Sequence, residues 1–102
     1  MKEIITHLQK AFDHRIRLGV MSMLMVNDWV DFTTLRDNLE VSDGNLASHL
    51  KALEKTGYIE LRKQFIGRRP NTSYRASEKG RTAFLEHLSY LEKIINMQKS
   101  GD

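Results

Sequence analysis

The sequence predicts a small, mostly helical α+β domain, and three observations support this fold class. Apolar residues recur at helical spacing over most of the chain. One stretch, residues 58–76, instead alternates apolar and polar side chains on both sides of a turn, as a β-hairpin does. The chain has 102 residues and one proline. We expect residues 1–102 to form a single domain, because independently folding domains cluster at roughly 100 to 150 residues.

Composition excludes several protein classes. Hydrophobic residues make up 40% of the chain and charged residues 28%, so neither a disordered nor a membrane-embedded protein is favoured. The longest apolar run, residues 20–26, is interrupted by Ser22 and is far shorter than the roughly 18 to 20 residues of a membrane span. The N-terminus lacks the apolar core of a secretory signal. Without cysteine, the chain has no disulfide, thiolate metal site or cysteine nucleophile. We therefore expect a cytoplasmic protein.

Two helices are expected before residue 27. The first covers residues 1–12, where apolar side chains recur three or four positions apart: Ile4 or Ile5, Leu8 and Phe12. Asp13 can cap a second helix over residues 14–26. This helix is apolar on most sides, so we expect it to be the central helix of the core.

A very short strand and a short helix should follow. Residues 29–32 alternate like a strand. Thr34 with Asp37 resembles a capping box, which would open a helix that runs through Glu40.

A capped helix over residues 43–56 comes next. Ser42 is a natural N-cap, and Gly57 marks the end of the helix. Its apolar residues form a narrow seam: Leu46, Leu50 and Leu53. Small, polar and basic side chains cover its other faces: Asn45, Ser48, His49, Lys51, Ala52 and Lys55. Residues 34–57 thus form two helices joined by a tight connection, as in a helix-turn-helix.

Residues 58–77 are expected to form a hairpin. Residues 58–66 alternate as YIELRKQFI, and their inward candidates are Ile59, Leu61 and Phe65. Residues 72–76 supply the second strand. Between the strands, residues 67–71 form a turn-forming insert with a protruding basic tip.

Positive charge is concentrated in this hairpin. The net charge of the whole chain is only +3. Residues 61–77, however, carry no acidic side chain and five basic ones: Arg62, Lys63, Arg68, Arg69 and Arg75. The other 85 residues hold 11 basic and 13 acidic side chains. A polyanion is therefore the first partner to consider.

The order of these elements is that of a winged helix-turn-helix. A helix fits the major groove of B-DNA and can read base edges there if its outward face is polar and sterically light. The helix over residues 43–56 has such a face. Ser42, at its N-terminus, could also donate to a phosphate. The hairpin lets Arg68 and Arg69 extend towards phosphates or into the minor groove.

A resemblance to a known family covers nearly the whole chain. The run VSDGNLASHLKALEKTGYIELRKQFIGRRPNTSYRASEKGRTAF, residues 41–84, resembles the recognition helix, wing and following helix of MarR/ArsR-type winged-helix transcriptional regulators, especially their short forms. The segment DHRIRLGVMSML resembles their first core helix. The resemblance implies a recognition helix that faces the major groove, a wing tipped by two arginines, and dimerisation through terminal helices. The metal-sensing members use cysteine, histidine and carboxylate clusters, which this chain does not match, so we expect neither a metal nor a cofactor.

Ten residues are the candidate contacts to double-stranded DNA. On the helix they are Ser42, Asn45, Ser48, His49 and Lys51, and on the wing Lys63, Arg68, Arg69, Asn71 and Thr72. Asn45 could instead support the turn geometry after Gly44, and His49 could be a surface histidine without a role. Arg62 and Lys63 alternate along the strand, so only one of them should face DNA. Strand parity with Phe65 places Lys63 inward, whereas the family resemblance places it near phosphates.

A homodimer is expected from the two ends of the chain. Ser77 can cap a last helix over residues 78–98, and residues 1–12 supply the other terminal helix. Their apolar residues form surfaces that a core of roughly 75 residues cannot cover completely: Ile5, Leu8, Phe12, Phe84, Leu88, Leu91 and Ile95. Two-fold symmetry then predicts an operator that is an inverted repeat.

The sequence also bears on functions other than DNA binding. No nucleophile turn, glycine-rich phosphate loop or paired carboxylate is visible, so we do not expect an enzyme. A metal site built from His7 and His87 across a dimer lacks partners at ligand spacing. A winged-helix module that binds an acidic protein is the alternative function. A small-molecule effector could act on a regulator of this kind, and repression is the expected outcome because the chain has no separate activation domain.

Overall fold

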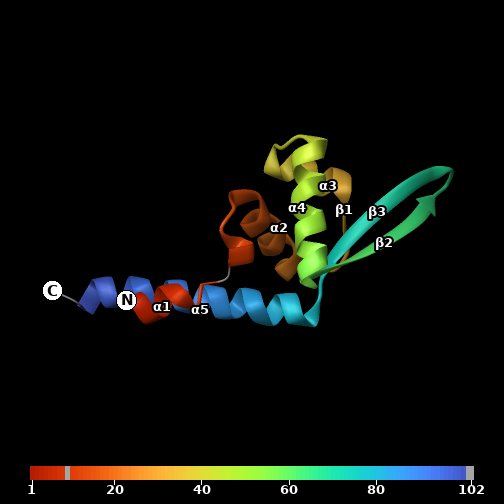
Figure 1. Cartoon of the computed structure of the whole chain (residues 1–102). Helices are drawn as coiled ribbons and strands as arrows, with labels where there is room; N and C mark the ends of the chain where they lie inside the picture. The colour runs from red at the N-terminus through yellow and green to blue at the C-terminus, as the bar shows by residue number, and fades with distance from the viewer. Residues whose placement is uncertain (9, 101–102) are drawn as a thin grey trace.

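The computed structural model describes residues 1–8 and 10–100, and it confirms a mostly helical α+β architecture. The elements follow in the order α1 (Lys2–Thr6), the short 3-10 helix η1 (Lys10–Phe12), α2 (Arg15–Val26), β1 (Val30–Asp31), α3 (Phe32–Leu39), α4 (Asp43–Thr56), β2 (Ile59–Ile66), β3 (Arg69–Ala76) and α5 (Glu78–Ser100). Figure 1 shows α2, α3 and α4 gathered above α5, with the β2–β3 hairpin projecting away from them. In the described part of the chain, no helix is both long enough and apolar enough to cross a bilayer.

The core forms where α2, α3 and α4 meet. Its fully buried side chains are Val20, Met21, Leu24, Leu35, Leu46, Leu50 and Leu53. The central place predicted for α2 is confirmed, and so is the leucine seam of α4. Because this seam is buried, the opposite side of α4 must face outward.

The caps of α4 are those the sequence predicts. Ser42 Oγ accepts a hydrogen bond from the backbone N–H of Asn45 at 3.2 Å. Gly57 ends the helix in the left-handed region, with φ 85°, where glycine carries no Cβ penalty. Asn45 lies inside α4, so its alternative role in a turn after Gly44 is wrong.

The predicted caps of α2 and α3 were wrong. His14 caps α2 in place of Asp13, because its Nδ1 accepts from the N–H of Ile16 at 3.1 Å. Asp31 caps α3 in place of Thr34, and its carboxylate accepts from the N–H of Thr34 at 2.8 Å. Hydrogen bonds from Thr34 also lower the pKa of Asp31. The last strand residue of β1 is thus the cap of the next helix, which therefore begins at Phe32.

The hairpin is longer than predicted and its turn is shorter. In the three-stranded antiparallel sheet, of order β1-β3-β2, β2 pairs with β3 from Ile59 opposite Ala76 to Ile66 opposite Arg69. The predicted insert over residues 67–71 is therefore wrong, since only two residues connect the strands. Gly67 has φ 64°, a conformation that a two-residue hairpin turn requires and that glycine adopts readily.

The predicted helix over residues 1–12 is interrupted. Its first part, α1, lies along α5 (Figure 1), where the His7 ring stacks on that of Tyr90 at 4.8 Å. Phe12, in η1, enters the core instead and packs on Tyr58 and Phe84, with ring centroids 5.4 and 5.2 Å away. One straight helix cannot satisfy both contacts, which explains why α1 ends at Thr6.

Helix α5 begins where the sequence predicts. Ser77 Oγ accepts from the N–H of Gly80 at 3.0 Å. Gly80 is buried against the strand that begins the wing, and a Cβ at this position would lie 2.0 Å from the backbone oxygen of Tyr58. Glycine thus permits the close approach of α5 to the wing.

Candidate nucleic-acid interface

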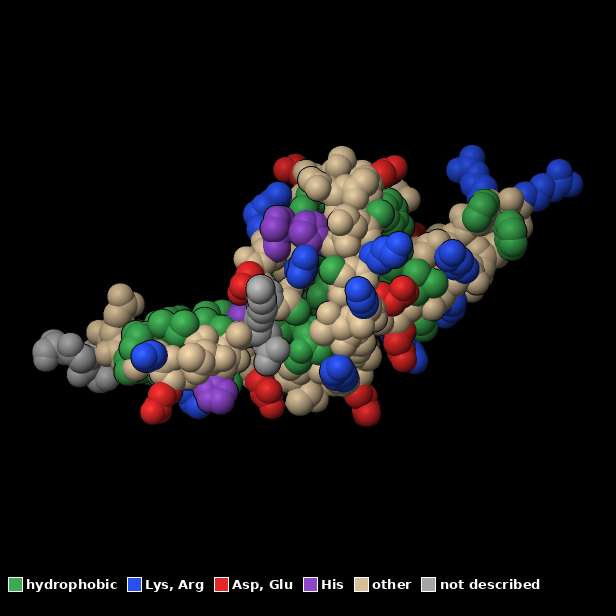
Figure 2. All heavy atoms as spheres, in the orientation of Figure 1, with side chains coloured by type: hydrophobic (Ala, Val, Ile, Leu, Met, Phe, Trp, Pro, Cys, Tyr) green, Lys and Arg blue, Asp and Glu red, His purple; other side chains and the backbone are tan. Residues whose placement is uncertain are grey.

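The outward side of α4 carries small, polar and basic side chains. Asn45, Ala47, Ser48 and Lys51 are exposed along it. In Figure 2, Lys and Arg side chains (blue) lie over this side of the molecule and at the far end of the hairpin. The combination of small polar and basic groups suits insertion into a DNA groove.

A hollow between α4 and the hairpin brings three candidate residues together. Lys51 lines it from α4, and Lys63 and Thr72 line it from the hairpin. Lys63 and Thr72 are also directly paired across the two strands. Of the two basic residues Arg62 and Lys63, Lys63 is therefore the one that lies beside α4.

Arg62 lies on the other face of the hairpin. Its guanidinium is 4.2 Å from the centre of the Trp29 ring, and that of Arg75 is 4.7 Å away. Arg75 also forms a 2.6 Å ion pair with Glu60. Arg62 Nε is buried without a hydrogen-bond partner among the described residues. These two arginines hold the base of the wing to the segment before β1, which the sequence did not reveal.

The wing tip is exposed and carries both charge and apolar surface. Arg68 and Arg69 are exposed, as predicted. Phe65 is also 73% exposed, and Leu61 is 38% exposed. Both lie on the same face of β2 as Ile59, but their predicted burial was wrong, because the outer half of the hairpin extends past the body of the molecule (Figure 1). Of the three inward candidates, only Ile59 is buried.

His49 is tied to α2 and is not simply presented outward. Its Nδ1 accepts a hydrogen bond from Arg17 Nε at 3.0 Å, and its ring centre lies 4.1 Å from that of His14. Burial and the nearby charges of His14 and Arg17 lower the pKa of His49, which favours the neutral ring. With Nδ1 as the acceptor, the proton is assigned to Nε2, which can donate to another group. The contact with Arg17 spans 32 positions, and no sequence pattern indicated it.

Two other candidates have structural partners. Ser42 Oγ is occupied as the cap of α4. Asn71 Oδ1 accepts from Ser73 Oγ at 3.0 Å, and the Asn71 side chain also bonds Asp31. Asn71 therefore faces β1, on the side of the hairpin opposite Lys63.

An exposed ion pair spans the connection between α3 and α4. Arg36 contacts Asp43 at 3.0 Å and Asp37 at 3.1 Å. Glu40 ends α3 in the left-handed region, with φ 52°.

The apolar residues of the terminal helices divide into two groups. Phe12 and Phe84 are only 3% exposed and belong to the core of the chain itself, so they do not supply the exposed surface that their assignment to a dimer interface requires. Leu8 and Leu91 are half-buried. The exposed group on these helices includes Ile5, Leu85, Leu88, Ile95 and Met97.

The two histidines considered for a metal site between subunits, His7 and His87, differ in exposure within one chain. His87 is buried, with its ring 5.1 Å from that of Phe12, whereas His7 is exposed on α1. Within the described ranges, no group of three or more potential ligands could hold a metal ion.

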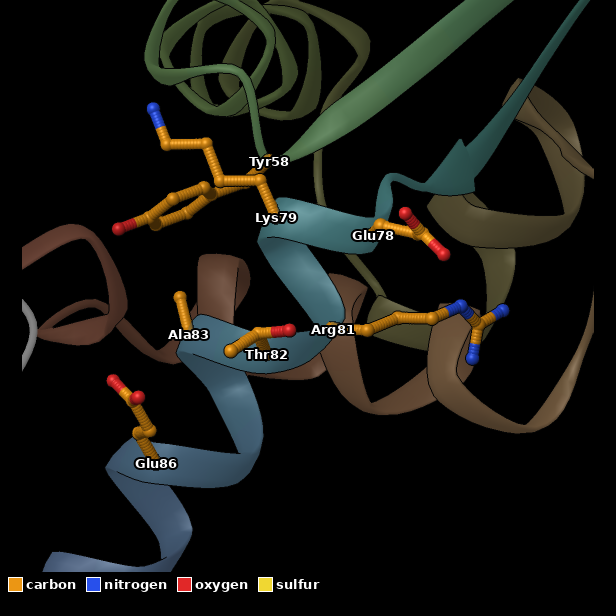
Figure 3. Close-up of a pocket in the computed structure, with 7 residues that line it drawn as sticks. All are labelled: Tyr58, Glu78, Lys79, Arg81, Thr82, Ala83 and Glu86. Carbon is orange, nitrogen blue, oxygen red and sulfur yellow. The ribbon is translucent and has the colours of Figure 1, made fainter.

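A second hollow lies at the start of α5, beside the C-terminal end of α4. Figure 3 shows its lining residues, with Lys79 lying along the Tyr58 ring. Lys79 Nζ donates to the backbone oxygen of Thr56 at 2.9 Å. Arg81 points the other way (Figure 3) and reaches the carbonyl oxygens of Leu24 and Met25, both at 3.4 Å. These contacts hold α5 against the ends of α2 and α4.

The comparisons with known proteins agree with this geometry. The family of winged helix DNA-binding domains matches residues 16–95. The chain is 33% identical over 91 residues to an uncharacterised protein of Methanocaldococcus jannaschii. The aligned region covers 89% of this chain and 96% of that protein.

Two solved structures extend the likeness. A transcriptional regulator homologue protein from Pyrococcus horikoshii OT3 is 29% identical with a TM-score of 0.82, over 93% of this chain and 92% of that one. HlyU from Vibrio cholerae N16961 is 26% identical with a TM-score of 0.66, over 88% and 95%. The resemblance to winged-helix transcriptional regulators that residues 41–84 predict is confirmed. The chain belongs to the family of winged helix DNA-binding domains.

Proposed function

We propose that this protein is a homodimeric transcriptional repressor that binds an inverted-repeat operator in double-stranded DNA. The observation that carries the proposal is the placement of Lys51, Lys63 and Thr72 around one hollow between α4 and the wing. This hollow adjoins the exposed polar side of α4, so one continuous surface combines groups for base edges with groups for phosphates.

The proposed division of labour follows from side-chain chemistry. Asn45 and Ser48 are exposed on α4 and can hydrogen-bond base edges in the major groove. Lys51 and Lys63 are point charges suited to phosphates. His49 would donate through Nε2, in an orientation held by the Arg17 hydrogen bond.

The wing tip completes the proposed footprint. Arg68 and Arg69 are exposed at the end of the hairpin and would lie on phosphates or in the minor groove. Asn71 takes no part in this footprint, because its side chain bonds Ser73 and Asp31.

The dimer would form through the exposed apolar residues of α1 and α5. Ile5, Leu88 and Ile95 are 51%, 41% and 51% exposed within one subunit. Burying them between subunits contributes about 25 cal/mol per Å² of apolar surface removed from water. Two-fold symmetry would place half-sites roughly 10 base pairs apart, or at a multiple of that spacing. Light scattering at micromolar concentration tests this step, and a strictly monomeric protein would refute it.

The test of DNA binding is a fluorescence-anisotropy titration against a random-sequence duplex pool at about 50 and 200 mM salt, followed by sequencing of the bound fraction. We expect salt-sensitive binding that enriches an inverted repeat. Absence of binding even at the lower salt, with co-purification of an acidic protein, would favour the winged-helix protein-interaction module instead.

Matched variants separate the two kinds of contact. Replacing Arg68 and Arg69 with alanine should weaken binding to every sequence and flatten its salt dependence. Ser48→Ala should mainly relax sequence preference. Equal losses on random and enriched duplexes for both variants would contradict the proposed roles. Run-off transcription from a promoter that carries the enriched site tests repression, which predicts less transcript in the presence of the protein.

A further inference from the structure

The tip of the wing exposes apolar side chains that the fold does not use. Phe65 is 73% exposed and Ile66 is 60% exposed. Phe65 is paired directly with Pro70 on the neighbouring strand, so their side chains share one face of the hairpin. Neither residue belongs to the hydrophobic core. An aromatic ring left in water in this way gains free energy from any partner that covers it.

Strand parity determines which face Phe65 occupies. Side chains two residues apart lie on the same face of a strand, so Phe65 shares its face with Lys63, and Pro70 shares its face with Thr72. Lys63 and Thr72 line the hollow beside α4. Phe65 therefore continues the surface that the recognition helix presents. Ile66 lies on the opposite face, paired with Arg69.

The surrounding charge indicates the chemistry of the partner. Arg68 lies in the turn, Arg69 is next to Pro70, and residues 61–77 contain no acidic side chain. A second copy of this tip would be repelled by the arginines, whereas a polyanion would be attracted. The partner must carry phosphate groups. It must also offer an apolar gap that is wide enough for one aromatic ring. Stacked base pairs in duplex DNA have both properties.

We propose that Phe65, supported by Pro70, is an apolar wedge that enters the minor groove between two base pairs and bends the duplex. Two strands of a sheet are about 4.8 Å apart before their side chains are counted, and the minor groove is about 6 Å wide. The ribbon itself therefore stays outside, and only side chains at its tip enter. Arg68 and Arg69 bind the flanking phosphates. This inference rests on the proposed DNA-binding function and adds a deformation of the DNA to it.

The experiment uses the full chain and the duplex most enriched from the random pool. Donor and acceptor dyes on the duplex ends report bending, and 2-aminopurine substituted at successive positions reports unstacking. We expect the protein to shorten the end-to-end distance and to raise 2-aminopurine fluorescence at one discrete step under each wing. Phe65→Ala should abolish both signals and weaken binding about tenfold, since loss of one base-aromatic stacking contact has that order of effect. Its salt dependence should stay unchanged, because no phosphate contact is lost.

Matched variants make the test specific to one face of the wing. Phe65→Leu keeps an apolar wedge and should retain most of the bend. Ile66→Ala removes an exposed apolar residue from the opposite face and should leave the bend intact. Val26→Ala removes another exposed residue, 80% exposed at the end of α2 next to α5, and should change nothing. Equal thermal unfolding of all four variants would show that they are folded.

Three results would overturn the wedge. The protein could bind tightly while the duplex stays straight and stacked, Phe65→Ala could bend DNA like the parent protein, or Ile66→Ala could abolish the bend as fully as Phe65→Ala does. Failure of the parent protein to bind DNA at all, even at about 50 mM salt, would refute the proposed function itself and is readily distinguished from these three.

Discussion

Alanine at position 80 should destabilise this protein, although alanine normally favours a helix. A Cβ on Gly80 would lie 2.0 Å from the backbone oxygen of Tyr58, and such contacts essentially never fall below 3.0 Å. Helix α5 would therefore have to move at least about 1 Å away from the start of the wing. The Tyr58 oxygen also accepts a hydrogen bond from the N–H of Ser77 at 3.0 Å, which that movement would strain.

The expected magnitude combines three effects. Overpacking against a backbone atom costs about 1–3 kcal/mol or more, and the strained hydrogen bond costs about 0.5–1.5 kcal/mol. The higher helix propensity of alanine offsets about 1 kcal/mol of this. Gly80→Ala should thus lower the free energy of unfolding by about 0.5–3.5 kcal/mol, and each kcal/mol lowers Tm by roughly 4–8 °C in a domain of this size.

Urea unfolding followed by circular dichroism measures this change, and Gly44→Ala is the matched control. Gly44 is exposed in the first turn of α4, and a Cβ there meets nothing within 4 Å. The same substitution should therefore stabilise the protein at position 44, by up to about 0.5–1 kcal/mol. If Gly80→Ala were as stable as the parent protein, the close approach of α5 to Tyr58 would be refuted as the reason for glycine.

Three further predictions concern the turn, the wing and the histidines. Glu40→Gly should raise the free energy of unfolding by about 1 kcal/mol, because it removes the left-handed strain at φ 52°; an unchanged urea midpoint would contradict this. Trp29→Ala should lower the free energy of unfolding by about 2 kcal/mol, since the Arg62 and Arg75 guanidinium groups lose the ring beneath them. Trp29→Phe should lower the free energy of unfolding by less in the same assay. Burial lowers the pKa of both His49 and His87 in the folded protein. In the unfolded chain, a histidine has a pKa of about 6.5. Just below about pH 6.5, the folded protein therefore binds fewer protons than the unfolded chain. Stability should therefore be complete above about pH 6.5 and fall as the pH is lowered from there through the folded-state pKa values, and His49→Gln should reduce this fall in unfolding titrations at pH 7, 6 and 5.

Local signals in the sequence were sufficient for α4 and its surroundings. The cap at Ser42, the end at Gly57 and the leucine seam all depend on neighbours within a few positions. Short-range spacing therefore predicts where the recognition helix begins, where it ends and which side is buried. The identity of the outward side chains follows from the same pattern.

The errors arose where distant contacts decided the outcome. Phe12 enters the core because Tyr58 and Phe84 surround it, and this ends the N-terminal helix early. Asp31 caps α3 because pairing of β1 with β3 fixes where the strand ends.

Alternation alone also could not distinguish a covered strand from an uncovered one. The pattern of β2 continues to Phe65, but the body of the protein covers only its beginning at Ile59. The number of residues that a hairpin extends beyond its domain depends on the packing of other elements, which no local pattern encodes.

In the proposed dimer, the length of α5 has a consequence for the spacing of operator half-sites. Its 23 residues span about 34 Å, close to the roughly 34–36 Å of one turn of B-DNA. In a dimer built on α5, the point along this helix at which two copies meet fixes the distance between their recognition helices. A shift of the apolar contact by one helical turn moves one subunit by about 5.4 Å, between one and two base-pair steps at 3.4 Å each. A few substitutions near Leu88 or Ile95 could therefore change the operator spacing that the dimer accepts while leaving every DNA-contacting residue unaltered.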